Sequence, residues 1–266
     1  MNKTIEFLRS LQTEAGAFRG WVDGPAYCEI TGYLIPTLLQ HGERKMAIDA
    51  ARYLIAAQNE DGSWTGMGSY HADGSVITPG VPAVFDTAAC IEGLRCMVPI
   101  FDYQKQIDRA IAWIHKQTMN SVYHYRVCGS LEEPPTFPLV VSGETRSHYF
   151  AYALEGLYLL GEHERVRKAL AKLPRGMQPH TLNGEGSDTC ATAQVAKLRL
   201  LLGMDASVEI NELRSLVGDD GSLPHDRENP KKVAWACKYY LDVEYLSRQV
   251  GGKEWNEVTE WQFGHL

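Results

Sequence analysis

The sequence lacks long hydrophobic runs: no stretch of 18 or more apolar residues occurs, so it predicts no membrane-spanning helix. The N-terminus carries Glu6 where a secretory signal peptide has its apolar core, so we expect no export. The six cysteines are far apart and form no C-x-x-C pair, which favours reduced thiols over a disulfide framework. These absences together predict a cytoplasmic protein.

The sequence also lacks a run of Lys and Arg. Its 26 basic residues face 33 acidic ones, which gives a formal net charge of −7. Binding of a nucleic acid requires a basic patch, so we expect no such partner. The nucleophile elbow, the P-loop and the dinucleotide fingerprint are missing as well, which argues against the enzyme classes that depend on them.

What the chain has is ordinary globular composition over 266 residues, with 44% hydrophobic and 22% charged residues. This excludes disorder as the main state and predicts one domain, residues 1–266, with a large core. Alternating strand patterns are scarce, apart from short pieces near 136–141. Apolar residues at i, i+3 and i+4 instead predict an all-α fold. The helical segments are 31–40, 47–57, 87–98, 107–115, 149–160, 166–173, 192–202 and 233–246.

These helices are of two kinds that alternate along the chain. One kind is poor in charge and is expected to be covered on most sides, as at 32–39, 88–94 and 151–158. The other kind carries charge on one face, as at 43–52 and 162–172. The alternation predicts a repeat of helical pairs, about five inner and five outer helices. An open solenoid is the alternative, but the apolar inner helices favour a closed ring.

Glycine turns recur after the amphipathic segments, at 12–18, 58–64 and 218–223. The glycine permits the positive φ that ends a helix, and the following apolar residue anchors the chain. The segment Gln58-Asn59-Glu60-Asp61-Gly62-Ser63-Trp64 resembles the Q-x-x-D-G-x-W repeat of terpenoid cyclases and protein prenyltransferases. That resemblance implies an α/α toroid, in which inner helices surround a central cavity and outer helices sheath them.

A second resemblance is more local. Segments 29–36, 85–87, 148–157 and 235–242 look like parts of uncharacterised bacterial toroid proteins found with surface-polysaccharide genes. This likeness suggests sugar chemistry and supplies no established catalytic residue. The ligand expected from it is a saccharide or a similarly polar small molecule.

In a toroid the loops that enter the inner helices meet at one end of the cavity, so residues near those helix starts are the candidate site. The candidate catalytic residues are Glu29, Asp86, Arg146, His148, Tyr149 and Asp188. The candidate substrate-binding residues, mostly aromatic, are Trp21, Trp64, His71, Tyr123, His124, Trp235 and Lys238. The simpler interpretation is N-capping by Asp86, Ser147, Asp188 and Asn229.

Two reactions on a saccharide stay open. Hydrolysis requires two carboxylates, for which Glu29, Asp86 and Asp188 are candidates. Elimination from a uronate requires a base such as His148 or Tyr149 and a cation such as Arg146. A terpenoid cyclase is an alternative, although the D-x-D-D and D-D-x-x-D motifs are absent. A non-catalytic binding scaffold is another.

No cofactor is expected. A weaker possibility is zinc, because Asp188-Thr189-Cys190 resembles the Asp-x-Cys pair of protein prenyltransferases, with His225 or His148 to complete the site. One such pair is a weak signal for zinc. The aromatic C-terminal segment 255–266 is expected to pack on the ring or on another subunit.

Overall fold

The computed structural model describes residues 2–70, 76–78, 80–120 and 145–250, and this part contains ten helices and two short strands. The all-α prediction is confirmed. None of the described helices is long and apolar enough to cross a membrane. Chain contacts divide the protein into unit 1, Met1–Ser10 with Val141–Leu266, and unit 2, Leu11–Val140. The expectation of a single domain stays a prediction.

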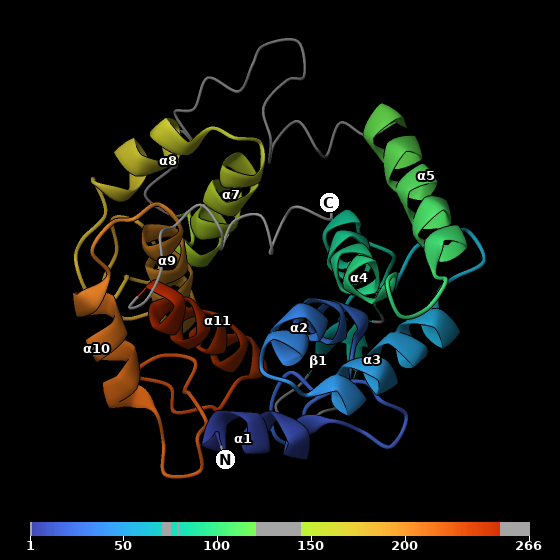
Figure 1. The fold of residues 1–266 in the computed structure, drawn as a ribbon, viewed down its shortest axis with the longest axis horizontal. Coiled ribbons are helices and arrows are strands. Elements are labelled where there is room, and N and C mark those ends of the chain that lie inside the picture. The colour runs from blue at the N-terminus through green and yellow to red at the C-terminus, as the bar shows by residue number, and fades with distance from the viewer. Residues whose placement is uncertain (1, 71–75, 79, 121–144, 251–266) are drawn as a thin grey trace. The chain divides into compact units, whose positions relative to one another are not determined.

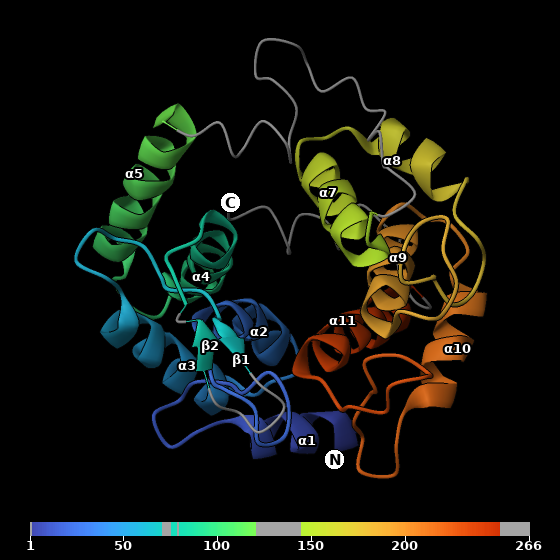
Figure 2. The ribbon, with the colours of Figure 1, turned by 180° about the vertical axis from the view of Figure 1, so that it is seen from behind.

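Unit 2 contains two buried helices, α2 (Cys28–Gln40) and α4 (Val84–Met97), with α3 (Arg44–Ala57) and α5 (Gln104–Asn120) against them (Figure 1). The backbones of α2 and α4 approach closely because glycines face each other. A Cβ atom on Gly93 would lie 2.4 Å from the carbonyl oxygen of Gly32. The two short strands β1 (Ser69–Tyr70) and β2 (Val76–Thr78) pair antiparallel in the loop before α4 (Figure 2).

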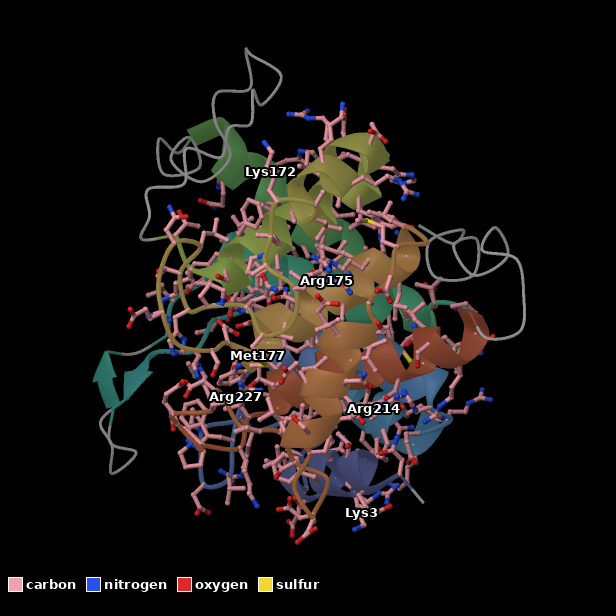
Figure 3. The ribbon with its side chains drawn as sticks, turned by 90° about the vertical axis from the view of Figure 1, so that its left-hand side faces the viewer. Lys3, Lys172, Arg175, Met177, Arg214 and Arg227 are labelled. Atoms are coloured by element: carbon pink, nitrogen blue, oxygen red, sulfur yellow. The ribbon has the colours of Figure 1, made fainter. Side chains whose placement is uncertain are left out.

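Unit 1 is arranged around α9 (Thr189–Leu201), which contacts α7 (Ser147–Leu159), α8 (His163–Leu170), α10 (Ser207–Leu216) and α11 (Ala234–Val250). The helix α1 (Lys3–Leu11) begins in this unit. Ion pairs join the helices: Arg199 of α9 lies 2.9 Å from Glu209 of α10. Arg175, which is 44% exposed and is labelled in Figure 3, pairs with the same carboxylate at 3.0 Å. Glu209 is fully buried, so its charge is compensated within the core.

The three predicted glycine turns are present, and Gly16, Gly62 and Gly221 all have positive φ, between 84° and 96°. Each glycine lies against the backbone of a charged helix, so a Cβ atom there would come within 2.6 Å of a backbone atom. In the first two turns the side chain of a glutamine holds the loop by hydrogen bonds. The Nε2 of Gln58, for example, donates to the carbonyl oxygens of Gly62 and Gln106, at 3.0 and 2.9 Å.

A second repeated contact joins each turn to the next buried helix. The amide of Trp64 donates to Thr87 Oγ1 (3.1 Å), and the amide of Phe18 donates to Thr31 Oγ1 (2.9 Å). The acceptor is the fourth residue of its helix in both cases. In unit 1 the acceptors at the same position are Thr192, for Gln178, and the sulfur of Cys237, for Leu223. The turn at 173–178 is therefore a fourth copy, which its sequence does not reveal.

All eight predicted helical segments are helices, and six of them start three residues earlier than predicted. The helices α1 and α10, nine and ten residues long, were not predicted. The two strands were missed because two or three residues carry no alternation. The strand pieces near 136–141 and the packing of 255–266 lie outside the described residues.

Candidate functional site

Unit 2 brings two of the predicted carboxylates together. Glu29 is the second residue of α2 and Asp86 is the third residue of α4. The two helices pack directly on each other, so their first turns lie side by side. Asp86 is buried and Glu29 is partly buried. The sequence prediction that these two side chains share one site is supported by their electrostatic interaction.

The pKa values of the two carboxyls are both raised. Burial and the nearby charge of Asp86 raise the pKa of Glu29 to about 8. Burial also raises the pKa of Asp86, but the amide groups of Met67 and of Asp86 itself oppose this by donating to its carboxylate. At neutral pH Glu29 is therefore protonated, whereas the amides that donate to Asp86 favour the ionised form of its carboxyl.

The loop before α4 holds Asp86 in place. A Cβ atom on Gly66 would lie 2.8 Å from both carboxylate oxygens of Asp86, so only glycine leaves room for them. Gly66 also donates its amide to Val81 at 2.9 Å, which closes the base of the strand pair. One turn further along α4, the thiol of Cys90 lies 3.5 Å from the carbonyl oxygen of Cys28. The backbone at Gly66 thus borders Asp86, and both carboxyls are close enough to Cys90 for their charges to raise the pKa of its thiol.

Unit 1 contains a second cluster of predicted residues, at the starts of α7, α9 and α11. His148 Nδ1 lies 2.8 Å from Gln194 Oε1. Burial lowers the pKa of His148, so its imidazole is neutral near pH 7, although the charge of Asp188 opposes this shift. His225 is close enough to contribute to the lowered pKa of His148. The centre of the His225 ring lies 6.2 Å from that of Trp235.

An ion-pair network that sequence reasoning missed continues from this cluster along the same helices. Lys197 of α9 lies 3.3 Å from Glu155 of α7 and 3.3 Å from Asp242 of α11. Asp242 also accepts a hydrogen bond from Lys238 at 2.9 Å, and the ammonium of Lys238 lies 3.9 Å from the centre of the Tyr239 ring. The signal available in the sequence was the spacing of Lys238 and Asp242, two opposite charges at i and i+4 of one helix.

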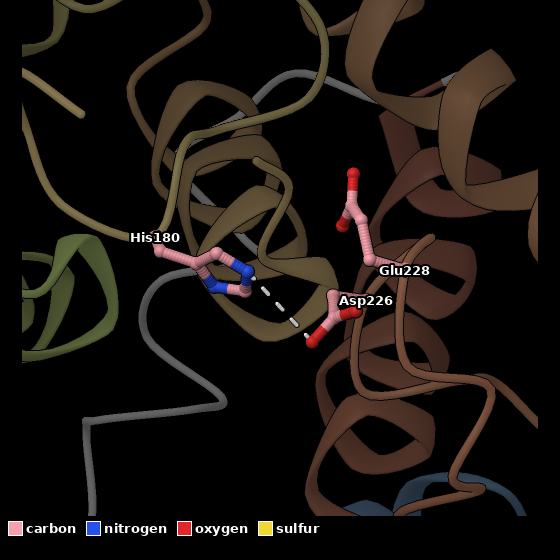
Figure 4. Close-up of side chains that lie close together, drawn as sticks. All are labelled: His180, Asp226 and Glu228. Carbon is pink, nitrogen blue, oxygen red and sulfur yellow. Dashed lines mark ion pairs between the residues drawn. The ribbon is translucent and has the colours of Figure 1, made fainter. Parts of the chain in front are cut away.

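A third group of side chains lies in the loops that precede α9 and α11. His180, Asp226 and Glu228 each offer one ligand atom, and these atoms all lie within 4.8 Å of one another (Figure 4). Sequence reasoning missed all three. The sequence also suggests zinc at Asp188, Cys190 and His225. Two of these side chains make other contacts in the structure. Asp188 accepts the amide of Ala191 at 2.8 Å, and the thiol of Cys190 faces Gln194 at 3.8 Å.

Two predicted substrate-binding residues are core residues instead. Trp64 has no exposed surface, and its indole N–H donates to the carbonyl oxygen of Leu54 at 2.8 Å. Lys238 is 3% exposed and is held by Asp242. Contact of either side chain with a substrate is therefore not supported. The mistake for Trp64 has a clear reason, since the tryptophan of this turn anchors the loop in the core.

The remaining candidates are placed at or near the surface. Tyr149 is 60% exposed and its ring lies 5.6 Å from that of His148, while Arg146 is exposed just before α7. Trp21 is partly exposed and stacks on Gly24. Trp235 is partly exposed as well. The predicted residues His71, Tyr123 and His124 lie outside the described residues.

The capping interpretation holds for one residue only. Asp188 is the N-cap of α9 and its side chain accepts the Ala191 amide. Asp86 lies inside α4, whose N-cap is Ala83, and Ser147 lies inside α7, whose N-cap is Arg146. Capping by Asn229 is also wrong, because α11 begins at Ala234. Asp86 is thus not the N-cap of α4, although its carboxylate accepts its own amide and that of Met67.

Comparison with solved structures shows the fold. A glycosidase variant in complex with glucose matches 92% of this chain and 95% of its own, with a TM-score of 0.52 and 11% identity. The wild-type glycosidase matches the same shares with a TM-score of 0.51 and 11% identity. An unsaturated glucuronyl hydrolase specific for heparin covers 98% of this chain and 97% of its own, with a TM-score of 0.48 and 14% identity. The glycosidases have an α/α-toroid fold, and the chain shares that fold class.

No protein-family model matches the chain. No curated protein matches its sequence either.

Proposed function

We propose that the protein is a carbohydrate-active enzyme that hydrolyses a glycosidic bond, with Glu29 as the proton donor and Asp86 as the ionised carboxylate. The observation that carries the proposal is the carboxyl pair of unit 2, in which Glu29 has a pKa of about 8 beside the Asp86 charge. The shared fold with glycosidases, one of them in complex with glucose, supports a saccharide as the ligand.

Hydrolysis of a glycoside needs one carboxylic acid and one carboxylate at the same bond. Protonated Glu29 gives its proton to the oxygen of the departing sugar. Asp86 either takes a proton from the attacking water or bonds to the anomeric carbon until water replaces it. In both routes one water is consumed, and Glu29 recovers its proton at the end of the cycle. The amides that donate to Asp86 keep its charge available for this step.

A uronate-specific elimination is the second candidate, and one observation favours it. The buried imidazole of His148 has a lowered pKa and is neutral near pH 7, so it is able to accept a proton. Tyr149, whose ring is 5.6 Å away, and Arg146 at the start of α7 are the companions expected for such a reaction. This site lies within unit 1, whereas the carboxyl pair lies within unit 2.

The test is turnover of a panel of nitrophenyl glycosides by the wild type and by the Glu29→Gln and Asp86→Asn variants. We expect each substitution to lower kcat/KM by about 10²–10⁴-fold, the usual contribution of a positioned acid or base. Glu92→Gln, an exposed carboxylate on the same helix as Asp86, is the matched control and should leave turnover unchanged. Binding of glucose, followed by calorimetry, should persist in Asp86→Asn.

The pH profile gives an independent readout. Activity should fall above a pH near 8, as Glu29 loses its proton, and this limb should be absent in Glu29→Gln. Undiminished turnover in both carboxyl variants would overturn the hydrolase proposal. Unsaturated products that vanish in His148→Gln would favour elimination. Glucose binding without turnover of any substrate would favour the binding scaffold.

We also propose a cytoplasmic location. The five cysteines among the described residues carry free thiols, which supports a reducing, cytoplasmic location. The kinship with terpenoid cyclases and prenyltransferases rests on the Gln58 to Trp64 turn, whose hydrogen bonds serve to hold the fold together. That turn therefore supports a shared architecture more than a shared reaction.

A further inference from the structure

We propose that His180, Asp226 and Glu228 bind a divalent transition-metal ion such as Zn²⁺ or Mn²⁺. The inference concerns unit 1 alone and is independent of the proposed hydrolase. One ligand atom from each of the three side chains lies within 4.8 Å of the other two, and His180 Nε2 lies 3.8 Å from Asp226 Oδ2 (Figure 4). Two ligands at about 2.1 Å from a tetrahedral metal lie roughly 3.4 Å apart, so only a small closure is needed.

The charge of the cluster calls for a cation. Two carboxylates converge here, two residues apart in sequence, and no described Lys or Arg forms an ion pair with either of them. Arg227 stands between them in the sequence, but its guanidinium pairs with Glu212 on α10. His180 and His225 are the neighbours that face the Asp226 carboxylate, and an imidazole nitrogen without a proton offers a lone pair to a metal ion. A metal ion would supply the missing positive charge.

Neighbouring groups already hold the three side chains in place. Asp226 is 4% exposed, and one of its oxygens lies 2.6 Å from His225 Nδ1 while the other accepts the amide of Asn229. Ser187 donates its hydroxyl to Glu228 at 2.9 Å and accepts the amide of Arg227 at 2.8 Å. Hydrogen bonds that orient the ligands are a regular part of metal sites, where they fix geometry before the metal arrives.

The imidazole of His180 is positioned by close contact with the loop before α9. A Cβ atom on Gly186 would lie 2.5 Å from His180 Cδ2, so the absence of a side chain there brings the ring against the backbone. The histidine belongs to the segment before α9, and the two carboxylates belong to the segment before α11. A bound metal ion would therefore join these two loops.

The donor set indicates which metal ions fit. Zn²⁺ takes both imidazole nitrogen and carboxylate oxygen as ligands, and Mn²⁺ binds well to carboxylates and follows Zn²⁺ as a candidate. Ca²⁺ and Mg²⁺ prefer sites made of oxygen ligands only. We therefore expect Zn²⁺ and Mn²⁺ to bind at concentrations at which Ca²⁺ and Mg²⁺ do not.

The experiment uses the full chain, freed of metal with a chelator and then titrated separately with ZnCl₂, MnCl₂, MgCl₂ and CaCl₂ in a calorimeter. The expected result is one equivalent of Zn²⁺ or Mn²⁺ per chain, with a rise in the melting temperature. His180→Gln and Glu228→Gln should each weaken that binding at least about tenfold. Both side chains lie outside the buried core, and circular dichroism of the metal-free variants checks that they fold.

The matched control is Glu185→Gln, which removes an exposed carboxylate from the same loop as His180. Glu185 contacts His180 through its backbone carbonyl only, so its substitution should leave metal binding unchanged. The proposal is overturned if the wild type binds neither Zn²⁺ nor Mn²⁺. Equal affinity in His180→Gln, Glu228→Gln and the wild type would overturn it as well, since any metal would then be bound elsewhere.

Discussion

Buried charged groups have different neighbours in the two units. In unit 1 the buried charged groups within helices α9, α10 and α11 are paired, as in Lys238 with Asp242 and Arg199 with Glu209. In unit 2 two carboxyls, Glu29 and Asp86, meet with no cation within ion-pair distance among the described residues, and the pKa of each is raised. Paired buried charges are explained by the fold alone. Burial raises the pKa of both carboxyls and the charge of Asp86 raises that of Glu29 further, and groups with pKa values shifted in this way are often catalytic.

The largest expected effect tests the paired side of this comparison. Asp242→Ala removes the carboxylate that compensates Lys238, which is 3% exposed, and it also removes a partner of Lys197. Breaking a buried pair from one side leaves an uncompensated charge and costs about 3–5 kcal/mol. The free energy of unfolding, measured with urea, should fall by that amount.

The control for this loss is the double variant Lys238→Met with Asp242→Leu. Replacing both partners by apolar side chains of similar size is often neutral or stabilising, so the double variant should recover most of the stability. If the double variant were as unstable as Asp242→Ala, the loss would reflect packing and not the unpaired charge.

Substitution of the unpaired carboxyl Glu29 should raise the free energy of unfolding, whereas Asp242→Ala lowers it. The pKa of Glu29 is about 8 in the folded protein, against 4.5 for an ordinary glutamate. Between these values the folded protein keeps a proton that the unfolded chain has lost, so its stability falls as pH rises and levels off above pH 8. Glu29→Gln should therefore gain on the wild type by up to about 1.4 kcal/mol per pH unit in this window.

Thermal unfolding of both proteins from pH 5 to pH 9 measures that gain. Glu60→Gln, an exposed carboxylate in a turn of the same unit, should show a constant difference from the wild type. A constant difference for Glu29→Gln as well would mean that Glu29 is ionised at neutral pH, and the proton-donor role would lose its basis.

The glycine turns, which both units share, allow a finer comparison. Gly62 and Gly42 both have positive φ, 96° and 79°, but only Gly62 is packed against another helix, with a Cβ position 2.6 Å from the carbonyl oxygen of Arg109. Gly42 has open space around its Cβ position. We expect Gly42→Ala to cost about 1–2 kcal/mol for the backbone conformation alone. Gly62→Ala should cost more in the same urea titration, and equal losses would argue against a packing role.

The smallest effect concerns the contact between turn and helix. Thr87→Val keeps the shape but removes the oxygen that accepts the amide of Trp64, leaving a buried N–H without a partner. The expected loss is about 1–2 kcal/mol. Thr192→Val in unit 1 should cost a similar amount, because Thr192 accepts the Gln178 amide in the same way. Thr87→Ser retains the hydroxyl and should cost less, and calorimetric melting curves rank the three variants.

Much of the fold was predictable because it depends on local pattern. The apolar spacing placed eight of the ten described helices, and the Asp-Gly-Ser letters identified two turns in which Asp61 and Asp220 accept the serine amide two residues on. The turn at Gly176 carries none of those letters, yet it makes the same contact with Thr192. The sequence pattern therefore identified the turns that contain Asp-Gly-Ser. It missed the turn at Gly176, which is recognised only by its contact with the next helix.

The candidate site was predictable only in part. Glu29 and Asp86 were chosen for their places near helix starts, and the structure puts them in one site because α2 and α4 pack along glycines. Trp64 was chosen for its aromatic ring, and it lies in the core. His180, Asp226 and Glu228 lie in loops that no periodicity describes, and 46 residues separate the first two in sequence.

The sequence by itself determined the elements of this protein: helices from apolar spacing, turns from glycine, and a mild negative net charge. These properties are local or additive, so they are readable without coordinates. The tertiary structure decided which charges are compensated, because the pKa of Glu29 and the pairing of Lys238 depend on neighbours from other helices. A burial cost or a Coulomb interaction is a property of distance in space, and the sequence does not contain that distance.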